Sequence, residues 1–251
     1  MKRTVLSFML AIISLVTINA RIFVLATGVS NYGNEDVNLS QTTKDAKRFK
    51  DVMETQTKDI TILTSSNVTR ANVLEKLRAI CNRAQKGDQV VFFYSGHGMP
   101  GGICGYDNTI SYDDIVEVLS SSKASAKICY IDACHAGSMS GAVKSSDGWE
   151  SRAKSYNIWA SRAKAYKDQA FFVSCRSDEY SSEHPILGAG LFTQALIKGL
   201  KGKSDKNGDK KITVMELFKY IRGDVMKHSK EKQHPQLIAP ESMYNVVVSI
   251  W

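Results

Sequence analysis

The chain has 251 residues, of which 43% are hydrophobic and 23% are charged, and its formal net charge is +8. Such a composition is typical of a globular domain. The excess of positive charge is modest and is concentrated in residues 144–167 and 198–211, with no basic stripe that carries aromatic residues, so we expect no nucleic-acid partner. The five cysteines are Cys81, Cys104, Cys129, Cys134 and Cys175. Their odd number and the lack of a CxxC pair argue against a small disulfide scaffold and against a zinc site.

The first 20 residues have the three parts of an export signal peptide. Lys2 and Arg3 give a positive start, residues 5–18 are almost entirely apolar, and Ala20 stands where a small residue precedes a cut. The apolar run is shorter than the ~20 residues that span a bilayer, so we favour a cleaved signal over a membrane anchor. We therefore expect a secreted or periplasmic protein that meets the membrane only through this segment. Residues 21–251 then form one mature domain with a net charge of +6, from 31 basic and 25 acidic residues.

The mature domain alternates buried strands with amphipathic helices. We expect strands at residues 21–27, 59–65, 89–94, 126–131, 170–174 and 244–250. We expect helices at residues 42–56, 69–85, 111–120, 190–199 and 214–226, with Thr69 as an N-cap. Continuous apolar strands that alternate with helices indicate an α/β fold with a mostly parallel six-stranded sheet and helices on both faces. Residues 138–169, which are basic and rich in serine, stand outside this pattern as an inserted loop.

Two motifs follow neighbouring strands of the predicted sheet, where sites lie in folds of this kind. Residues 94–98 read YSGHG, and residues 132–138 read DACHAGS. Small neighbours let a substrate approach Cys134, which makes it a candidate nucleophile, and glycines on both sides of His97 suit a general base in a tight turn. The backbone N–H groups of Gly98 and Cys134 are candidate donors to the oxyanion that forms during acyl transfer.

Each of these residues also has a simpler explanation. A single cysteine after a strand is most often part of the core, and a single histidine between glycines is most often a polar turn residue. His135 is a second candidate for the base, although a side chain next to a nucleophile usually points elsewhere. The occurrence of Cys134 and His97 at the ends of two consecutive parallel strands favours the catalytic interpretation.

Together the two motifs resemble those of the caspase-like cysteine peptidases, most closely the metacaspase branch in its bacterial, secreted form. Further similar segments are residues 28–32, 39–45, 174–183 and 190–193, so the likeness covers nearly all of 21–251. The resemblance implies a caspase-like three-layer sandwich and an endopeptidase that works through a Cys134–His97 dyad and a thioester acyl-enzyme. It also implies protein or peptide substrates and no required cofactor, and we expect a monomer.

The resemblance further implies an acidic pocket for the substrate residue before the cut bond. Asp132 and Asp45 match the two aspartates of that pocket, and Ser95 maps to it as well. Two carboxylates select a cation, so we expect cleavage after Arg or Lys. Taken alone, Asp45 is equally explained as a helix N-terminal acid that the helix dipole stabilises. Asp132 is harder to explain in another way, because an acid beside a buried strand end needs a partner or solvent.

The expected basic specificity suggests a role for residues 138–169, because the matching segment of the family is often cut during maturation. The segment contains six basic residues after which the enzyme would cut itself: Lys144, Arg152, Lys154, Arg162, Lys164 and Lys167. We therefore expect this inserted loop to be a processing segment.

Calcium is an open alternative at a second place. Some metacaspases bind calcium through several aspartates, and Asp107, Asp113 and Asp114 resemble part of that set. A helix N-terminus explains Asp113 and Asp114 as well, and we favour it. Residues 205–216 resemble an EF-hand loop, but Lys210 stands where such a loop needs glycine, so we expect a polar turn before a helix.

Two other functions stay open from the sequence. The first is a catalytically inactive caspase-like binding or regulatory protein, because a fold does not dictate an activity. The second is a peptidase of the same fold with a different pocket preference, for Asn or Asp. The presence of both Cys134 and His97 argues against the first, and the two pocket aspartates argue against acidic specificity in the second.

Overall fold

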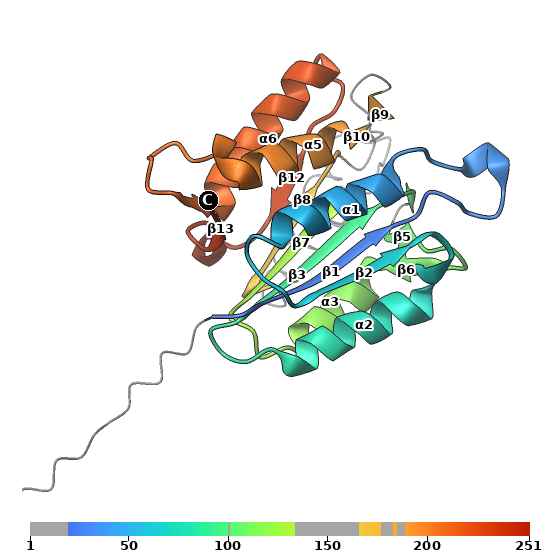
Figure 1. The fold of residues 1–251 in the computed structure, drawn as a ribbon, viewed down its shortest axis with the longest axis horizontal. Helices are drawn as coiled ribbons and strands as arrows, with labels where there is room; N and C mark the ends of the chain where they lie inside the picture. Colours follow the sequence, from blue (N-terminus) through green and yellow to red (C-terminus); the bar gives the residue numbers. More distant parts are fainter. Residues whose placement is uncertain (1–19, 100, 134–165, 177–182, 185–188) are drawn as a thin grey trace, which may run out of the picture.

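The computed structural model describes residues 20–99, 101–133, 166–176, 183–184 and 189–251. Its centre is a six-stranded sheet in the order β12-β8-β7-β3-β1-β2 (Figure 1). The strands are β1 (Ile22–Gly28), β2 (Ile60–Thr64), β3 (Gln89–Ser95), β7 (Ala126–Asp132), β8 (Gln169–Val173) and β12 (Gln236–Ile238). All neighbours run parallel except β12, which is antiparallel to β8. The predicted α/β class and the mostly parallel sheet of six strands are confirmed.

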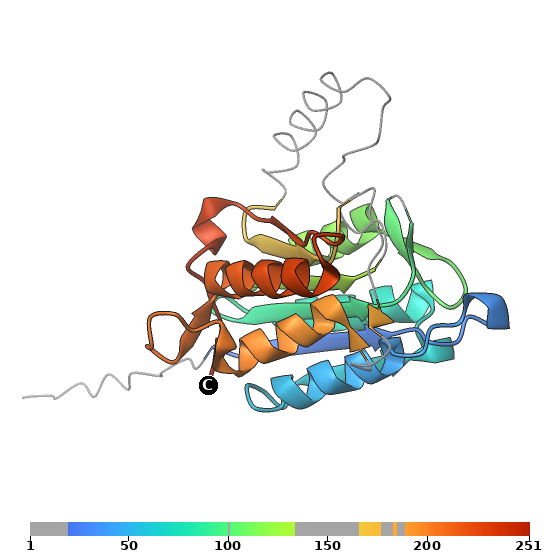
Figure 2. The same ribbon diagram turned by 90° about the horizontal axis from the view of Figure 1, so that it is seen from above.

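Helices cover both faces of the sheet (Figures 1 and 2). One face carries α1 (Thr42–Met53), α5 (Leu191–Lys198) and α6 (Val214–Ser229), and the other carries α2 (Arg70–Arg83) and α3 (Tyr112–Ser120). Because successive side chains of a strand point to opposite faces, one strand contributes to both cores. Phe92 packs on the α2–α3 side, whereas Phe93 packs under α1 with its ring stacked 4.4 Å from that of Phe49. The three layers therefore follow from the apolar runs in the strands.

Side-chain caps define where three of the helices begin. Thr69 accepts a hydrogen bond from the N–H of Asn72 and is the N-cap of α2, as predicted. Capping boxes start α3 at Ser111 and α6 at Thr213. All five predicted helices are present, and their ends lie within three residues of the predicted ones. In the described part of the chain, no helix is long and apolar enough to cross a membrane.

The prediction that residues 244–250 form the sixth strand of the sheet is wrong. The strand found there, β13 (Val247–Ile250), pairs with β11 (Lys211–Thr213) in a separate antiparallel sheet. The sixth place belongs to β12, which lies between Pro235 and Pro240. A short apolar segment between prolines resembles a loop in sequence. It is nevertheless suited to the edge of a sheet, because proline has no N–H to donate to a further strand.

Two small sheets lie beyond the carboxyl ends of the central strands. The first consists of β4 (Gly98–Met99), β5 (Gly102–Cys104) and β6 (Thr109–Ser111), and it directly follows β3. The second pairs β9 (Glu183–His184) with β10 (Ala189–Gly190), which leads directly into α5. The two small sheets therefore lie next to the edge of the central sheet where both sequence motifs are found.

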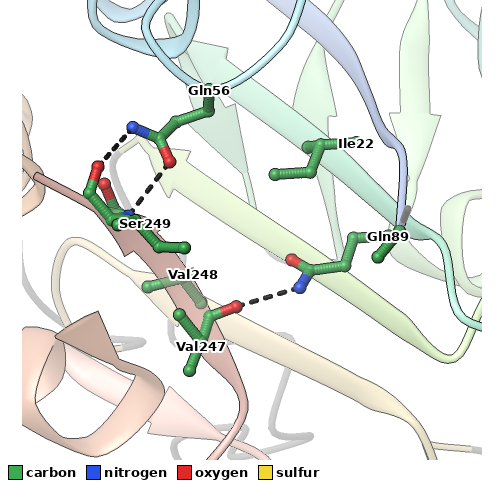
Figure 3. Close-up of a pocket in the computed structure, with 8 residues that line it drawn as sticks. Ile22, Gln56, Gln89, Val247, Val248 and Ser249 are labelled. Carbon is green, nitrogen blue, oxygen red and sulfur yellow. Dashed lines mark hydrogen bonds between the residues drawn. The ribbon is translucent and has the colours of Figure 1, made fainter. Parts of the chain in front are cut away.

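A small cavity lies at the opposite, amino edge of the sheet (Figure 3). It measures about 190 Å³, and its lining includes Ile22 and Gln89, the first residues of β1 and β3. The side chain of Gln56 exchanges hydrogen bonds with the main chain of Ile250, and that of Gln89 donates to the carbonyl of Val247. These bonds attach β13 over the start of the sheet, so the cavity is a packing feature far along the strands from the two motifs.

Candidate active site

The two motifs meet at the carboxyl edge of the sheet. Ser95 at the end of β3 lies opposite Asp132 at the end of β7 in the parallel register. Just beyond this pair, the N–H of Gly96 donates to the carbonyl of Asp132 at 3.1 Å, so the two strand ends continue side by side. His97 follows β3 in the sequence, and Cys134 follows β7. Cys134 itself lies outside the described residues.

The residue before Cys134 is fixed by the continuation of β8. The N–H of Ala133 donates to Ser174 Oγ at 3.1 Å, and its carbonyl accepts from Ser174 Oγ at 3.0 Å and from Cys175 Sγ at 3.3 Å. Both polar groups of the buried Ala133 main chain are therefore satisfied by one neighbouring segment. A main chain held in this way can present the next residue in a defined direction, as a nucleophile requires.

The imidazole of His97 is oriented by a backbone carbonyl. Its Nε2 lies 2.7 Å from the carbonyl oxygen of Val37, the last residue of η1 (Glu35–Val37). A carbonyl oxygen can only accept, so Nε2 carries the hydrogen in this contact, and the tautomer is assigned from it. Nδ1 then keeps the lone pair that a general base needs.

The main chain of His97 is held by two tyrosines. The N–H of His97 donates to the hydroxyl of Tyr32 at 2.7 Å, and the two rings lie 4.8 Å apart. The hydroxyl of Tyr94 lies 2.7 Å from the carbonyls of His97 and Cys104, which share it as a donor, and burial raises the pKa of Tyr94 well above its usual value. A Cβ on Gly96 would lie 2.3 Å from the Tyr94 hydroxyl, so only glycine fits there.

The proposed oxyanion donors are only partly within the described residues. Gly98 opens β4 and pairs with Ile103, so the small three-stranded sheet fixes it next to His97. The N–H of Cys134 and the side chain of His135 lie outside the described residues, as does the inserted loop up to residue 165. The oxyanion site and the alternative base therefore stay predictions. The other four cysteines, which all lie in the described part of the chain, form no disulfide.

The three residues predicted for the specificity pocket lie together and are almost fully buried. Asp45, Ser95 and Asp132 are 1%, 2% and 5% exposed. Asp45 Oδ2 accepts from Ser95 Oγ and from the N–H of Gly190, both at 3.4 Å. Asp132 Oδ2 accepts from Thr193 Oγ1 at 2.7 Å and from the Thr193 N–H at 3.2 Å. A Cβ on Gly190 would lie 2.5 Å from Asp132 Oδ2, so the absence of a side chain lets this segment pass between the two acids.

The buried carboxyl group of Asp45 resists ionisation. Burial raises the pKa of Asp45 from 3.8 to about 7, and the negative charge of Asp132 adds to the rise. The Gly190 N–H opposes it, and so does the guanidinium of Arg48, which lies 3.6 Å from Asp45 Oδ1. That oxygen has no hydrogen-bond partner among the described residues. Asp45 does lie in the first turn of α1, but an inward-facing acid with a raised pKa is more typical of a functional site than of a helix end.

Three contributors to this site were not foreseen from the sequence. Val37 acts through its carbonyl, which leaves no trace in the type of residue. Tyr32 and Thr193 belong to segments that resemble the family, residues 28–32 and 190–193, but their partners appear only once the fold is known. Their contacts with His97 and Asp132 span 65 and 61 residues of chain.

Two of the three aspartates considered for calcium, Asp107 and Asp114, contact the same arginine. The N–H of Arg70 donates to Asp107 Oδ1 at 2.8 Å, and its guanidinium lies 3.0 Å from both oxygens of Asp114. Asp114 also completes the capping box of α3, and Asp113 lies in the first turn of that helix. The described residues contain no group of three or more His, Cys, Asp or Glu side chains suited to a metal ion. A calcium ion at Asp107 and Asp114 would have to displace Arg70.

The segment that resembles an EF-hand loop forms a polar turn before α6, as expected. Asp205 accepts from the N–H groups of Gly208 and Lys210 at 2.8 and 3.0 Å, and Lys210 takes a left-handed conformation with φ of 63°. Glu216 is engaged with the N-cap Thr213. The carboxylates of this turn thus satisfy backbone groups of the turn and the helix start.

Comparisons with known proteins agree with this architecture. The family model described as the caspase domain matches residues 21–243. A crystal structure of a protein from Geobacter sulfurreducens has a TM-score of 0.63 and 16% identity, and the match covers 92% of this chain and 99% of that one. The crystal structure of caspase-1 from Spodoptera frugiperda has a TM-score of 0.62 and 14% identity, with coverages of 92% and 89%. No curated protein sequence matches significantly. At these identities the structural matches show a shared fold.

Proposed function

The chain belongs to the caspase domain family of cysteine peptidases, and on this premise we propose that it is a metacaspase-like endopeptidase that cuts after Arg or Lys. The observation that carries the proposal is the pair of buried carboxylates, Asp45 and Asp132, at the strand edge that also bears His97. A guanidinium or ammonium group offers several donors and a positive charge that such a pair lacks. An acidic substrate side chain would be repelled there, so the pocket favours a basic residue before the cut bond.

In the proposed reaction, His97 Nδ1 takes the proton of the Cys134 thiol, and the sulfur attacks the carbonyl carbon of the substrate. The electron pair of the carbonyl bond moves to the oxygen, which the N–H groups of Gly98 and Cys134 stabilise. When the carbon–nitrogen bond breaks, the leaving amine takes the proton from His97, and a thioester remains. Water then gives a proton to His97 and attacks the thioester carbon; the carbon–sulfur bond breaks, and the departing sulfur takes the proton back from His97, which leaves the acid product and the thiol.

The contacts of His97 support its part in this sequence. The bond from Nε2 to Val37 selects the tautomer whose Nδ1 can accept a proton, and it stabilises the imidazolium that forms next. The bonds to Tyr32 and Tyr94 fix the peptide on both sides of the ring. A base whose position is fixed in advance avoids the entropy cost of being placed during the reaction.

We propose that the enzyme cuts itself within residues 138–169. This inserted loop joins β7, which ends in the pocket residue Asp132, to β8, so Lys144 stands ten residues after Cys134 in the chain, whereas Lys167 lies just before β8 at the amino edge of the sheet. Expression of the wild type and of Cys134→Ala tests the proposal. The wild type should appear as two fragments and the variant as one intact chain. Identical intact bands would contradict self-cleavage.

We also propose that the signal segment is removed after Ala20 and that the protein is secreted or periplasmic. The main-chain nitrogen of Arg21 lies 2.9 Å from an oxygen of Asp88, a carboxylate that is 4% exposed. A new α-ammonium group on Arg21 would therefore have a buried counter-ion ready. The Arg21 guanidinium pairs with Asp59 and lies over the ring of Phe23, which fixes the rest of this residue. Mass analysis of the exported protein should give Arg21 as the first residue, and any other start would contradict the proposal.

A panel of peptide substrates tests the proposed specificity. The mature protein should cleave peptides with Arg or Lys before the cut bond and leave matched peptides with Asn, Asp or Leu intact. Asp132→Asn should reduce cleavage after Arg by at least tenfold, because a buried ionic contact is worth about 1.5–3 kcal/mol. Cleavage after Asn or Asp would instead favour a different pocket preference. No cleavage of any peptide would favour a binding or regulatory protein.

A further inference from the structure

The two acids of the specificity pocket are held in different ways. Asp132 Oδ2 receives two hydrogen bonds from Thr193, at 2.7 Å from the hydroxyl and 3.2 Å from the N–H. Asp45 Oδ2 receives two contacts of 3.4 Å, from Ser95 and Gly190, which are longer than ordinary hydrogen bonds, and its Oδ1 has no hydrogen-bond partner among the described residues. Hydrogen bonds to a carboxylate favour its charged form, so the contacts favour the negative charge on Asp132.

The position of Thr193 strengthens this asymmetry. Thr193 lies in the first turn of α5, whose positive dipole end therefore points at Asp132. The Thr193 side chain is completely buried, so water does not compete for its hydroxyl. Thr193 therefore contacts Asp132 without being one of the residues predicted to meet the substrate.

Asp45 faces a different set of charges. Asp132 from β7 is the negative charge that acts on it, and Arg48 from its own helix is the positive one. The contacts from β3 and from the start of α5 come from Ser95 and Gly190, which are uncharged. Two buried carboxylates in one pocket cannot both ionise without a large cost, so they titrate as a pair, and the less well solvated one keeps the proton.

We propose that Thr193 is a positioning residue of the specificity pocket, which fixes Asp132 as the permanent anion and leaves Asp45 to carry the pocket's proton. The consequence rests on the proposed function, because the cation that replaces this proton is the Arg or Lys side chain of the substrate. When that cation enters, the O–H bond of Asp45 breaks, the electron pair stays on the carboxylate, and the proton leaves to solvent. Substrate binding and proton release are thereby coupled.

The burial of Asp45 sets the range of pH in which this coupling operates. Its pKa is raised to about 7 in the empty pocket, so the proton is present below neutral pH and absent above it. Affinity for a basic substrate should therefore increase as pH rises through about 7, because the pocket then offers two negative charges instead of one. A pocket with two independent surface carboxylates would complete this change near pH 4.

A carboxyl-carbon NMR titration of the ligand-free mature protein tests the proposal directly. The Cys134→Ala background prevents self-digestion, and Asp45→Asn and Asp132→Asn assign the two signals. Asp132 should titrate at lower pH than Asp45. Thr193→Val, which keeps the shape and removes the hydroxyl, should bring the two titrations closer together, and Thr193→Ser should keep them apart.

The outcomes separate this proposal from the proposed function. Titration of Asp45 below Asp132 in the parent protein overturns the proposal even if the valine variant fails to fold, and so does an unchanged titration in Thr193→Val. A shift of equal size in Thr193→Ser overturns it too, since that result would come from packing. With an Arg substrate, kcat/KM should rise as pH increases through about 7, and Thr193→Val should change this pH profile whereas Thr193→Ser should not. Absence of cleavage after Arg would count against the proposed function and leave the titration result standing.

Discussion

Replacement of Asp45 by Asn should make the protein more stable at neutral pH, although it damages the pocket. Burial raises the pKa of Asp45 from 3.8 to about 7, so the folded protein binds this proton more tightly than the unfolded chain does. The stability that results is fully present below pH 3.8 and is lost as pH rises through about 7. A rise of roughly three pKa units corresponds to about 4 kcal/mol of unfolding free energy. Asn carries no charge and should not suffer this loss.

Urea unfolding at several pH values between 5 and 8 measures this effect in the Cys134→Ala background. Part of the loss has already occurred at pH 5, so Asp45→Asn should gain about 2–3 kcal/mol relative to its parent between pH 5 and pH 8. Asp51→Asn is a matched control, because Asp51 lies on the same helix and is exposed. It should show no such pH-dependent difference. A difference between Asp45→Asn and its parent that is the same at every pH would refute the reasoning.

Three further predictions concern other contacts of the described chain. Tyr32→Phe removes the hydroxyl that accepts from the main-chain N–H of His97, the proposed general base, so kcat for an Arg substrate should fall about 10- to 100-fold with little change in KM; an increase in KM alone would argue against a positioning role. A mature chain with a free amine on Arg21 should be about 1–3 kcal/mol more stable in urea than the same chain acetylated there, and Asp88→Asn should abolish the difference. Asp168→Ala leaves the buried ammonium of Lys127 without its carboxylate and should lower the free energy of unfolding in urea by about 2 kcal/mol. The loss is limited because Asp168 is partly exposed to water, and Lys127→Met should be nearly neutral.

The layers of the fold could be predicted because their signals are local. Apolar runs such as residues 89–94 predict buried strands, and a threonine at 69 predicts where a helix begins. The meeting of the two motifs followed from one general rule, that the carboxyl ends of parallel strands share an edge of the sheet. Asp45 reached the pocket in the prediction through the family resemblance, because its sequence position alone fits a helix end equally well.

The parts that escaped prediction depend on partners far away in the chain. A strand of three or four residues is stabilised by what it pairs with, so β12 and β13 could not be told apart by pattern. The orientation of His97 depends on a carbonyl 60 residues earlier, and carbonyls are the same in every residue. The raised pKa of Asp45 depends on burial, and the hydrogen bond from Thr193 to Asp132 becomes visible only when α5 is placed against β7.

The central claim is that Cys134 is the nucleophile of a pocket that selects basic residues. An irreversible peptidyl ketone probe with Arg at the position before the reactive carbon tests it most directly, with mass spectrometry of the labelled mature protein as the readout. The account predicts one adduct, on Cys134, and no labelling by the matched probe with Asp. An adduct on Cys81, Cys104, Cys129 or Cys175, or equal labelling by the Asp probe, would contradict it.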